Sequence, residues 1–168
     1  MSEAEASRHR SARVILIDGA HRVLLWKSLD RPGMPEAGHR WHTPGGGVRD
    51  GETPAAAAAR ELREETGLAV RPRDLGPKIA ETSGYADLGW ARGVFQDDFF
   101  HLGVTAHHVE MGGQEAHETR HLAGHRWWPV GELAVTTETV HPLGLADLAA
   151  DLAAGRVPPT PVVLPWHH

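Results

Sequence analysis

The chain has 168 residues, enough for one domain with a buried core, because a globular chain of this size buries roughly 70% of the surface that it exposes when unfolded. It carries 17 lysines and arginines against 22 aspartates and glutamates, a net charge of −5, and so lacks the basic excess of proteins that bind long nucleic acids. Without cysteine the chain forms no disulfide, zinc–thiolate site or thiol nucleophile. Its first residues are too polar for a signal peptide, and its apolar runs are too short to span a membrane. We therefore expect a soluble cytoplasmic protein.

The first third of the chain predicts a loose arm, a hairpin and a loop. Residues 1–9 have no periodic apolar pattern, so we expect a flexible N-terminal arm. The runs 13–17 (RVILI) and 22–26 (RVLLW) are typical strands, and the DGAH between them is a turn signal. Residues 28–40 contain two prolines and two glycines, which favours a surface loop.

A helix is predicted from Pro54 to Thr66. The Thr53 hydroxyl can cap its free N–H groups, and proline is tolerated at the first helical position. Five alanines continue the helix, and Gly67 is expected to end it.

The last half of the chain predicts further strands and a second helix. Strands are expected within 78–82, 93–105 and 126–128, and a helix over 142–154 that Gly155 would end. The proline-rich stretch 156–168 predicts an extended C-terminal tail. Strands on both sides of one central helix, with another helix near the end, indicate an α/β sandwich with a mixed sheet.

Three carboxylates project from one side of the predicted helix. Glu61, Glu64 and Glu65 stand at positions i, i+3 and i+4. Like charges at these spacings repel, so a divalent metal ion would explain why the domain holds them together. The alternative is an acidic helix face that is merely solvated.

These glutamates belong to a longer pattern that resembles the signature of the Nudix hydrolases, G-x5-E-x7-R-E-U-x-E-E-x-G-U, where U is aliphatic. Every defined position is filled over 23 residues, by Gly46, Glu52, Arg60, Glu61, Leu62, Glu64, Glu65, Gly67 and Leu68. The resemblance implies an α/β/α sandwich with a mixed sheet and a catalytic loop-helix-loop. We assign this whole domain to residues 10–155.

The resemblance also implies roles for the site residues. Glu61 and Glu65 are the first choice for direct ligands of Mg²⁺ or Mn²⁺, which prefer oxygen donors. The Gly45 carbonyl would be a further ligand, and Glu52 either a ligand or a support for the others. Glu64 would complete the metal shell or act as general base, an assignment that stays open. The guanidinium of Arg60 would orient the catalytic acids, including Glu61; the simpler alternative for Arg60 is an exposed i, i+4 pair with Glu64.

Residues outside the signature give weaker hypotheses. Glutamates of the loop before the last strand could add a base or ligand, and a histidine at every fourth position could serve a transition metal if that segment were helical. Loop aromatics could stack on a base and loop arginines could bind phosphate, although packing and solvation are their commoner roles. The residues concerned are Glu115, Glu118, His117, His121, His125, Trp41, Tyr85, Trp90, Phe95, Arg31, Arg40 and Arg92.

The function implied is metal-dependent hydrolysis of a pyrophosphate bond in a small nucleotide derivative. Nucleoside triphosphates, nucleotide sugars, ADP-ribose and dinucleoside polyphosphates all remain open as substrates. A non-catalytic nucleotide sensor is the alternative, although such proteins often lose a signature acid and none is missing here. An isoprenoid diphosphate isomerase on the same fold would need a cysteine that the chain lacks. Homodimers are frequent in the family, and one chain does not reveal an interface.

Overall fold

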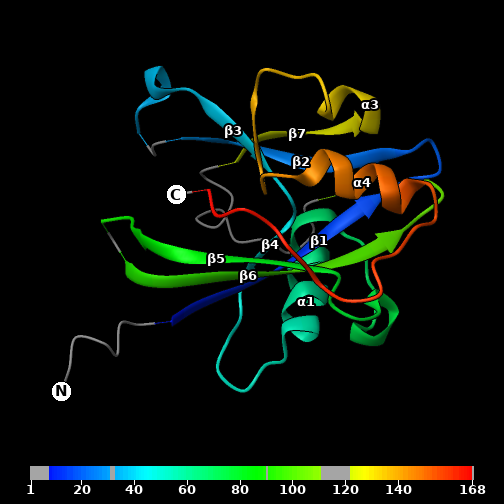
Figure 1. Cartoon of the computed structure of the whole chain (residues 1–168), viewed down its shortest axis with the longest axis horizontal. Coiled ribbons are helices and arrows are strands. Elements are labelled where there is room, and N and C mark those ends of the chain that lie inside the picture. The colour runs from blue at the N-terminus through cyan, green and yellow to red at the C-terminus, as the bar shows by residue number, and fades with distance from the viewer. Residues whose placement is uncertain (1–7, 31–32, 90, 111–121, 168) are drawn as a thin grey trace.

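A computed structural model describes residues 8–30, 33–89, 91–110 and 122–167, and it shows a curled mixed sheet with helices on both faces (Figure 1). Within these described ranges the sheet has nine strands, in the order β8-β3-β2-β1-β6-β5-β9, while β4 pairs with β1 and β7 pairs with β2. The strands are β1 (Arg8–Ile17), β2 (Arg22–Leu29), β3 (His39–His42), β4 (Gly45–Gly47), β5 (Ala80–Asp87), β6 (Arg92–Gly103), β7 (Leu122–Pro129), β8 (Thr139–His141) and β9 (Val162–Val163). The helices are α1 (Pro54–Thr66), α3 (Val130–Leu133) and α4 (Leu145–Ala153), with single 3₁₀ turns η1 (Pro35–Ala37) and η2 (Pro72–Leu75).

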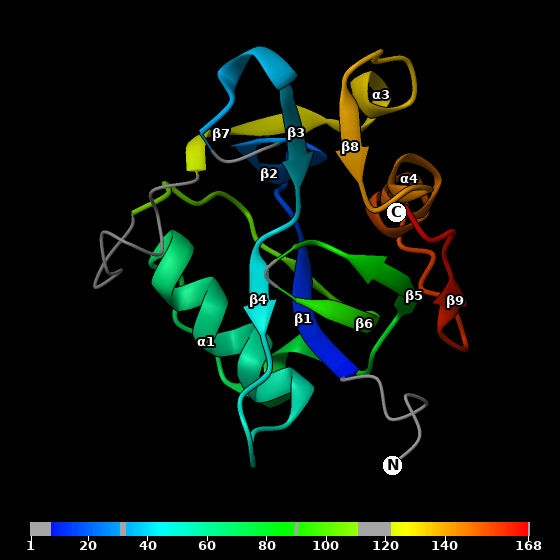
Figure 2. The same cartoon turned by 90° about the vertical axis from the view of Figure 1, so that its left-hand side faces the viewer.

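The two faces of the sheet carry separate apolar cores. Alternate residues of β1 point to opposite faces, so Val14 packs with Leu62 of α1 on one side. On the other side Ile15 packs in a cluster with Trp128 and with Leu148 of α4. Figure 2 shows α1 and α4 on opposite sides of the strands, so the predicted layered sandwich is confirmed.

Strand β1 organises the sheet and is longer than the predicted segment 13–17. It pairs in parallel with β6 from Arg8 to Ile17, and a polar stretch such as Arg8–Ser11 can extend along a partner strand without an apolar pattern. The predicted turn follows at once, where the buried Asp18 carboxylate accepts hydrogen bonds from the backbone N–H groups of Ala20 and Arg22 at 3.0 and 2.9 Å. Of the predicted arm 1–9, residues 1–7 lie outside the described part of the chain.

Helix α1 has the predicted bounds and caps. The Thr53 hydroxyl accepts a hydrogen bond from the Ala56 N–H at 3.1 Å, and Gly67 ends the helix in the left-handed conformation with φ of 78°. Helix α4 is shorter than predicted: Gly144, with φ of 87°, precedes Leu145, and the helix is capped at Ala154 instead of Gly155.

Several strand bounds differ from those predicted. The segment predicted at 78–82 forms β5 from Ala80 to Asp87, and 93–105 forms the single strand β6. The predicted loop 28–40 contains the end of β2, the turn η1 and the start of β3. Pairing between strands extends these elements across polar residues, which a local pattern does not reveal. In the described residues, none of the helices combines the length and apolar character that crossing a bilayer requires.

Candidate active site

Strand β4 brings the glycine triplet beneath helix α1. It pairs antiparallel with β1, so that Gly45 lies opposite Arg13 and Gly46 opposite Ala12. The carboxylate of Glu61 lies directly against Gly46, where an added Cβ would stand 2.5 Å from Glu61 Oε1 and 2.6 Å from its Cδ. The absence of a side chain at Gly46 therefore creates the space that the Glu61 carboxylate occupies.

Glu65 is the most buried acid of the helix, with 7% of the residue exposed. Its Oε2 accepts a hydrogen bond from the Gly45 N–H at 3.2 Å. Burial raises the pKa of Glu65 to about 8, the charge of Glu61 adds to this effect, and the charge of Arg13 opposes it. A negative charge on Glu65 is therefore costly unless a cation accompanies it.

Arg60 joins the acids of the helix to the loop before it. Its Nε and Nη2 donate to the two carboxylate oxygens of Glu52, both at 2.9 Å, and its Nη1 donates to Glu61 Oε1 at 2.8 Å. Its Nη2 also donates to the Gly47 carbonyl at 3.0 Å, whereas the contact with Glu64 Oε2 is longer, at 3.7 Å. The hydrogen bonds from Arg60 hold the pKa of Glu52 at about 2. The interactions of Arg60 are thus centred on Glu52 and Glu61, and the i, i+4 pair with Glu64 is a minor part of them.

A cavity of about 220 Å³ lies on the face of β1 that points away from α1, and Thr43 of the segment between β3 and β4 is part of its lining. Its lining includes Arg13, Arg40, Thr43, Phe95 and Trp166. Arg13 links the two regions, because its Nη1 donates to the Thr43 carbonyl at 2.9 Å and its charge acts on Glu65.

The polar lining of this cavity is partly desolvated. Burial lowers the pKa of His42 to about 3, with the charge of Arg13 adding to the effect, so His42 is neutral at physiological pH. The buried hydroxyl of Thr43 has no hydrogen-bond partner among the described residues. A buried polar atom of this kind is a natural contact point for a ligand.

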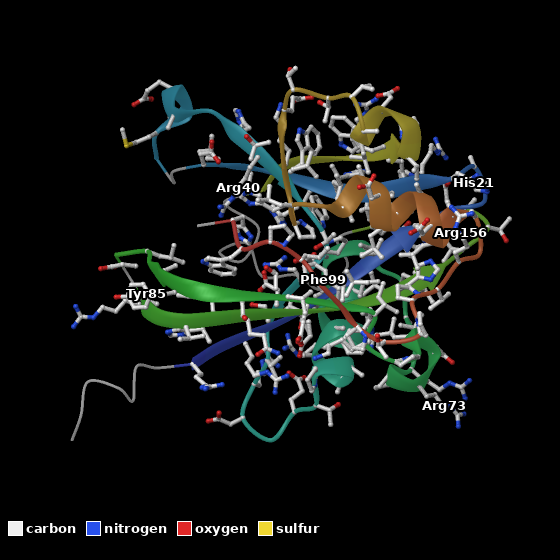
Figure 3. All side chains as sticks on the ribbon, in the orientation of Figure 1. His21, Arg40, Arg73, Tyr85, Phe99 and Arg156 are labelled. Carbon is white, nitrogen blue, oxygen red and sulfur yellow. The ribbon has the colours of Figure 1, made fainter. Side chains whose placement is uncertain are left out.

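The other candidates from the sequence have mixed outcomes. Trp41 is a core residue: it packs edge-on against Trp128, and its Nε1 donates to Glu138 at 3.1 Å. Tyr85 is 61% exposed near the tip of the β5–β6 hairpin (Figure 3). Phe95 and Arg40 line the cavity.

The remaining candidates do not add to the site that is described. Arg92 is exposed, and His125 lies in strand β7, so it cannot continue a helical series of histidines. Outside the described residues lie Arg31, Trp90, Glu115, His117, Glu118 and His121.

Among the cavity residues that sequence reasoning missed are Arg13, Asp97 and Trp166. Arg13 opens an otherwise apolar run, and a charged residue there was the one local signal of a polar site. Asp97 and Trp166 reach the cavity through strand pairing, which leaves no local signature.

Comparison with known proteins identifies the family. The family model of the NUDIX domain matches residues 7–148. The chain belongs to the Nudix family.

Curated Nudix relatives share only part of this chain. An RNA pyrophosphohydrolase from Dinoroseobacter shibae is 44% identical over 69 residues, which are 41% of this chain and 38% of that protein. A putative 8-oxo-dGTP diphosphatase 2 from Mycobacterium tuberculosis is 49% identical over 47 residues, 28% of this chain and 33% of that protein. The chain therefore matches well under half the length of these relatives.

Solved structures support the same fold. The NUDIX domain of Shewanella oneidensis NrtR, complexed with ADP ribose, superposes with a TM-score of 0.64 at 16% identity, covering 90% of this chain and 92% of that one. A MutT protein from Methanosarcina mazei Go1 superposes with a TM-score of 0.62 at 16% identity, covering 90% and 96%. At this identity the likeness concerns the fold alone.

The donor set fits the divalent metal ion that Nudix hydrolases generally need. In the described residues, no three acidic or histidine side chains already enclose a metal position. Arg60 is hydrogen-bonded to both Glu52 and Glu61. Glu61 and Glu65 nevertheless place carboxylate oxygens at Gly46 and Gly45, and the raised pKa of Glu65 means that its ionised form is stabilised by a nearby cation. Oxygen donors of this kind suit Mg²⁺ or Mn²⁺.

Proposed function

We propose that this Nudix protein is a hydrolase that cleaves a pyrophosphate bond in a small nucleotide derivative with the help of Mg²⁺ or Mn²⁺. The observation that carries the proposal is the burial of Glu65 beside Glu61, with both carboxylates against Gly45 and Gly46. Relatives named as an RNA pyrophosphohydrolase and as a putative 8-oxo-dGTP diphosphatase support chemistry at a phosphoanhydride. Nucleoside triphosphates, nucleotide sugars, ADP-ribose and dinucleoside polyphosphates are the substrate classes to be tested.

In this proposal Glu61, Glu65 and the Gly45 carbonyl hold the metal ion. When bound, a divalent ion polarises phosphoryl oxygens and lowers the pKa of a coordinated water. Glu64, whose side chain is 28% exposed at the edge of the group, completes the ligand set or takes the proton of the attacking water.

Arg60 and Glu52 keep the acids in place. Arg60 lies between the carboxylates of Glu52 and Glu61 and fixes the orientation of both, while Glu52 stays ionised and anchors the Arg60 guanidinium. In this proposal Arg60 is a positioning residue, and Glu52 either supports it or reaches the metal.

The proposal extends to compartment, domain bounds and assembly. A cytoplasmic location suits a chain without cysteine, which needs no oxidising compartment in order to fold. The hydrolase domain is assigned to residues 10–155, flanked by the arm 1–9 and the tail 156–168. A homodimer stays a prediction that sedimentation velocity can test.

The experiment is a product-resolved screen of the four substrate classes with Mg²⁺ and Mn²⁺, followed by kinetics of Glu64→Gln and Glu65→Gln. Each substitution is expected to lower turnover at least ~100-fold, the low end for a lost acid–base group. Asp147→Asn is the control, because Asp147 is an exposed acid of α4 on the opposite face of the sheet. Near-wild-type rates in both glutamine variants would overturn the proposal.

A non-catalytic sensor is the second candidate, supported by the ADP-ribose complex of the NrtR domain, which has the same fold. The same screen separates the two functions, because a sensor would bind one of the nucleotides and release no phosphate or nucleoside monophosphate.

A further inference from the structure

The C-terminal segment is anchored in the core by Leu164. Strand β9 pairs in parallel with β5, and the Leu164 N–H donates to the Glu81 carbonyl at 2.8 Å. The Leu164 side chain is 7% exposed and belongs to the same core cluster as Ile79 and Leu145. The chain is therefore fixed as far as Leu164, and the residues after it extend from this anchor.

Trp166 follows the anchor and lies over the β5–β6 pair. Its Nε1 donates to the Tyr85 carbonyl at 3.1 Å, and its ring stacks on that of Phe95 with 6.5 Å between the centroids. A Cβ added to Gly84 would collide with the indole, so this glycine leaves the space that the ring occupies. Trp166 nevertheless stays partly exposed, unlike Leu164. It is held by a hydrogen bond and by ring contacts, and not by enclosure in the core.

His167 carries the chain across to the other end of the sheet. Strands β9 and β8 stand at opposite ends of the strand order, yet the rings of His167 and of His141 in β8 are stacked with centroids 4.1 Å apart and an interplanar angle of 28°. Figure 1 shows the tail passing between β3 and the β5–β6 pair, and Figure 2 shows it between β9 and β8. Trp166 and His167, here called the latch, thus bridge two edges of the curled sheet.

The latch forms one side of the cavity. Trp166, His167 and His141 belong to its lining, whereas Arg13 and Phe99 line it from the central strands β1 and β6. With the latch in place the volume is about 220 Å³, below the roughly 300–1,000 Å³ of most small-molecule sites. Movement of the latch would therefore widen the cavity and leave the strands in place.

The contacts of the latch are weaker than those of its anchor. Loss of one aromatic pair shifts an equilibrium by about 2- to 13-fold. Truncation of a buried leucine such as Leu164 shifts the folding equilibrium by about 30- to 5,000-fold. The latch can thus open while the anchor stays packed.

We propose that Trp166 and His167 gate access to this cavity: the latch releases His141 before a small molecule enters, while Leu164 stays in the core. The inference goes beyond the proposed function, because it concerns entry to the cavity and applies to any molecule that binds there. A latch of this kind lowers the apparent affinity for such a molecule in proportion to the fraction of chains in which the latch is open.

The test uses an engineered thiol as a reporter of access, because the chain has no cysteine of its own. Ser11 lines the cavity, so Ser11→Cys places a thiol of similar size inside it. The rate of its reaction with dithiobis(nitrobenzoate), followed by absorbance, is compared between the full chain and a chain that ends at Pro165. Deletion of residues 166–168 is expected to raise this rate at least ~5-fold, the lower bound for losing two aromatic contacts. His167→Ala alone is expected to raise it by about 2- to 13-fold.

Two controls separate opening of the latch from a general loosening of the fold. Ser83→Cys places the thiol at an exposed position of β5 on the opposite face from Gly84, so its rate is expected to be the same in both chain lengths within about twofold. Val163→Ala, combined with Ser11→Cys, changes a 73% exposed residue of β9 before the anchor and is expected to leave the rate unchanged. His167→Ala keeps both Leu164 and Trp166, so it tests the latch even if the shortened chain is unstable.

Two results would overturn the latch: equal rates at Ser11→Cys with and without His167 and residues 166–168, or an equal acceleration at Ser83→Cys. The readout needs neither a nucleotide nor turnover. Failure of the substrate screen together with a thiol that the latch protects would therefore reject the proposed hydrolase and leave the latch standing.

Discussion

Replacing Arg60 by alanine tests whether this residue holds the acidic site together. The substitution removes two hydrogen bonds to Glu52, one to Glu61 and one to the Gly47 carbonyl. It also leaves the carboxylates of Glu52, Glu61 and Glu64 without the positive charge that separates them. We therefore expect the free energy of unfolding to fall.

The size of the loss follows from these contacts. A hydrogen bond to a charged group contributes about 1.5–3 kcal/mol, so four of them at the lower bound would sum to ~6 kcal/mol. The side chains of Arg60, Glu52 and Glu61 are 17–18% exposed, and bonds that share one guanidinium are not additive, so we halve that sum to ~3 kcal/mol. For a domain of this length the melting temperature would fall by roughly 6–12 °C.

The assay is urea unfolding in EDTA, with Arg63→Ala as the matched control. Arg63 lies on the same helix, is exposed, and makes no side-chain hydrogen bond within the described residues, so its loss is expected to change stability by no more than about 0.5 kcal/mol. Addition of Mg²⁺ is expected to restore part of the stability lost in Arg60→Ala, because the bound cation offsets the same carboxylates. A loss below ~1 kcal/mol, the ceiling for exposed ion pairs, would refute the reasoning.

Two further predictions concern the glycine triplet and the buried histidine. Gly46→Ala puts a Cβ 2.5 Å from Glu61 Oε1, so turnover is expected to fall at least ~10-fold. In Gly47→Ala the new Cβ has nothing within 4 Å, so turnover is expected to stay within about twofold of the wild-type rate. Steady-state kinetics measure both, and equal rates would contradict the close approach. For His42, the pKa of about 3 in the folded protein lies below the ordinary 6.5, so between these values the unfolded chain binds the extra proton and stability falls as the pH is lowered. Titration of His42 changes the free energy of unfolding by at most ~1.4 kcal/mol per pH unit. Urea unfolding at pH 7 and pH 5 should therefore show a smaller loss of stability in His42→Gln than in the wild type. Equal losses of stability would reject the burial of His42 as a neutral imidazole.

Local chemistry allowed helix α1 to be predicted to the residue. The capping hydroxyl of Thr53, the proline at the first helical position and the left-handed Gly67 all act within one turn of the helix ends, so their effect is visible in the sequence. The spacing of Glu61 and Glu65 likewise placed both on the side of the helix that meets β4.

Features that depend on pairing between distant segments could not be predicted in this way. The principal partner of Arg60 is Glu52 and not Glu64, because the loop before the helix turns back, with the Arg49 N–H bonded to Glu52 at 3.1 Å. Trp166 enters the cavity only because β9 pairs with β5 and Gly84 leaves room for its ring. A proline-rich tail and an isolated glycine carry no sign of each other in the sequence.

The most direct test of the metal site is anomalous diffraction from a crystal soaked in Mn²⁺. The account predicts a peak at roughly 2.0–2.6 Å from the carboxylates of Glu61 and Glu65 and from the Gly45 carbonyl. A soaked crystal with these carboxylates turned toward solvent, and with no anomalous peak beside β4, would contradict it.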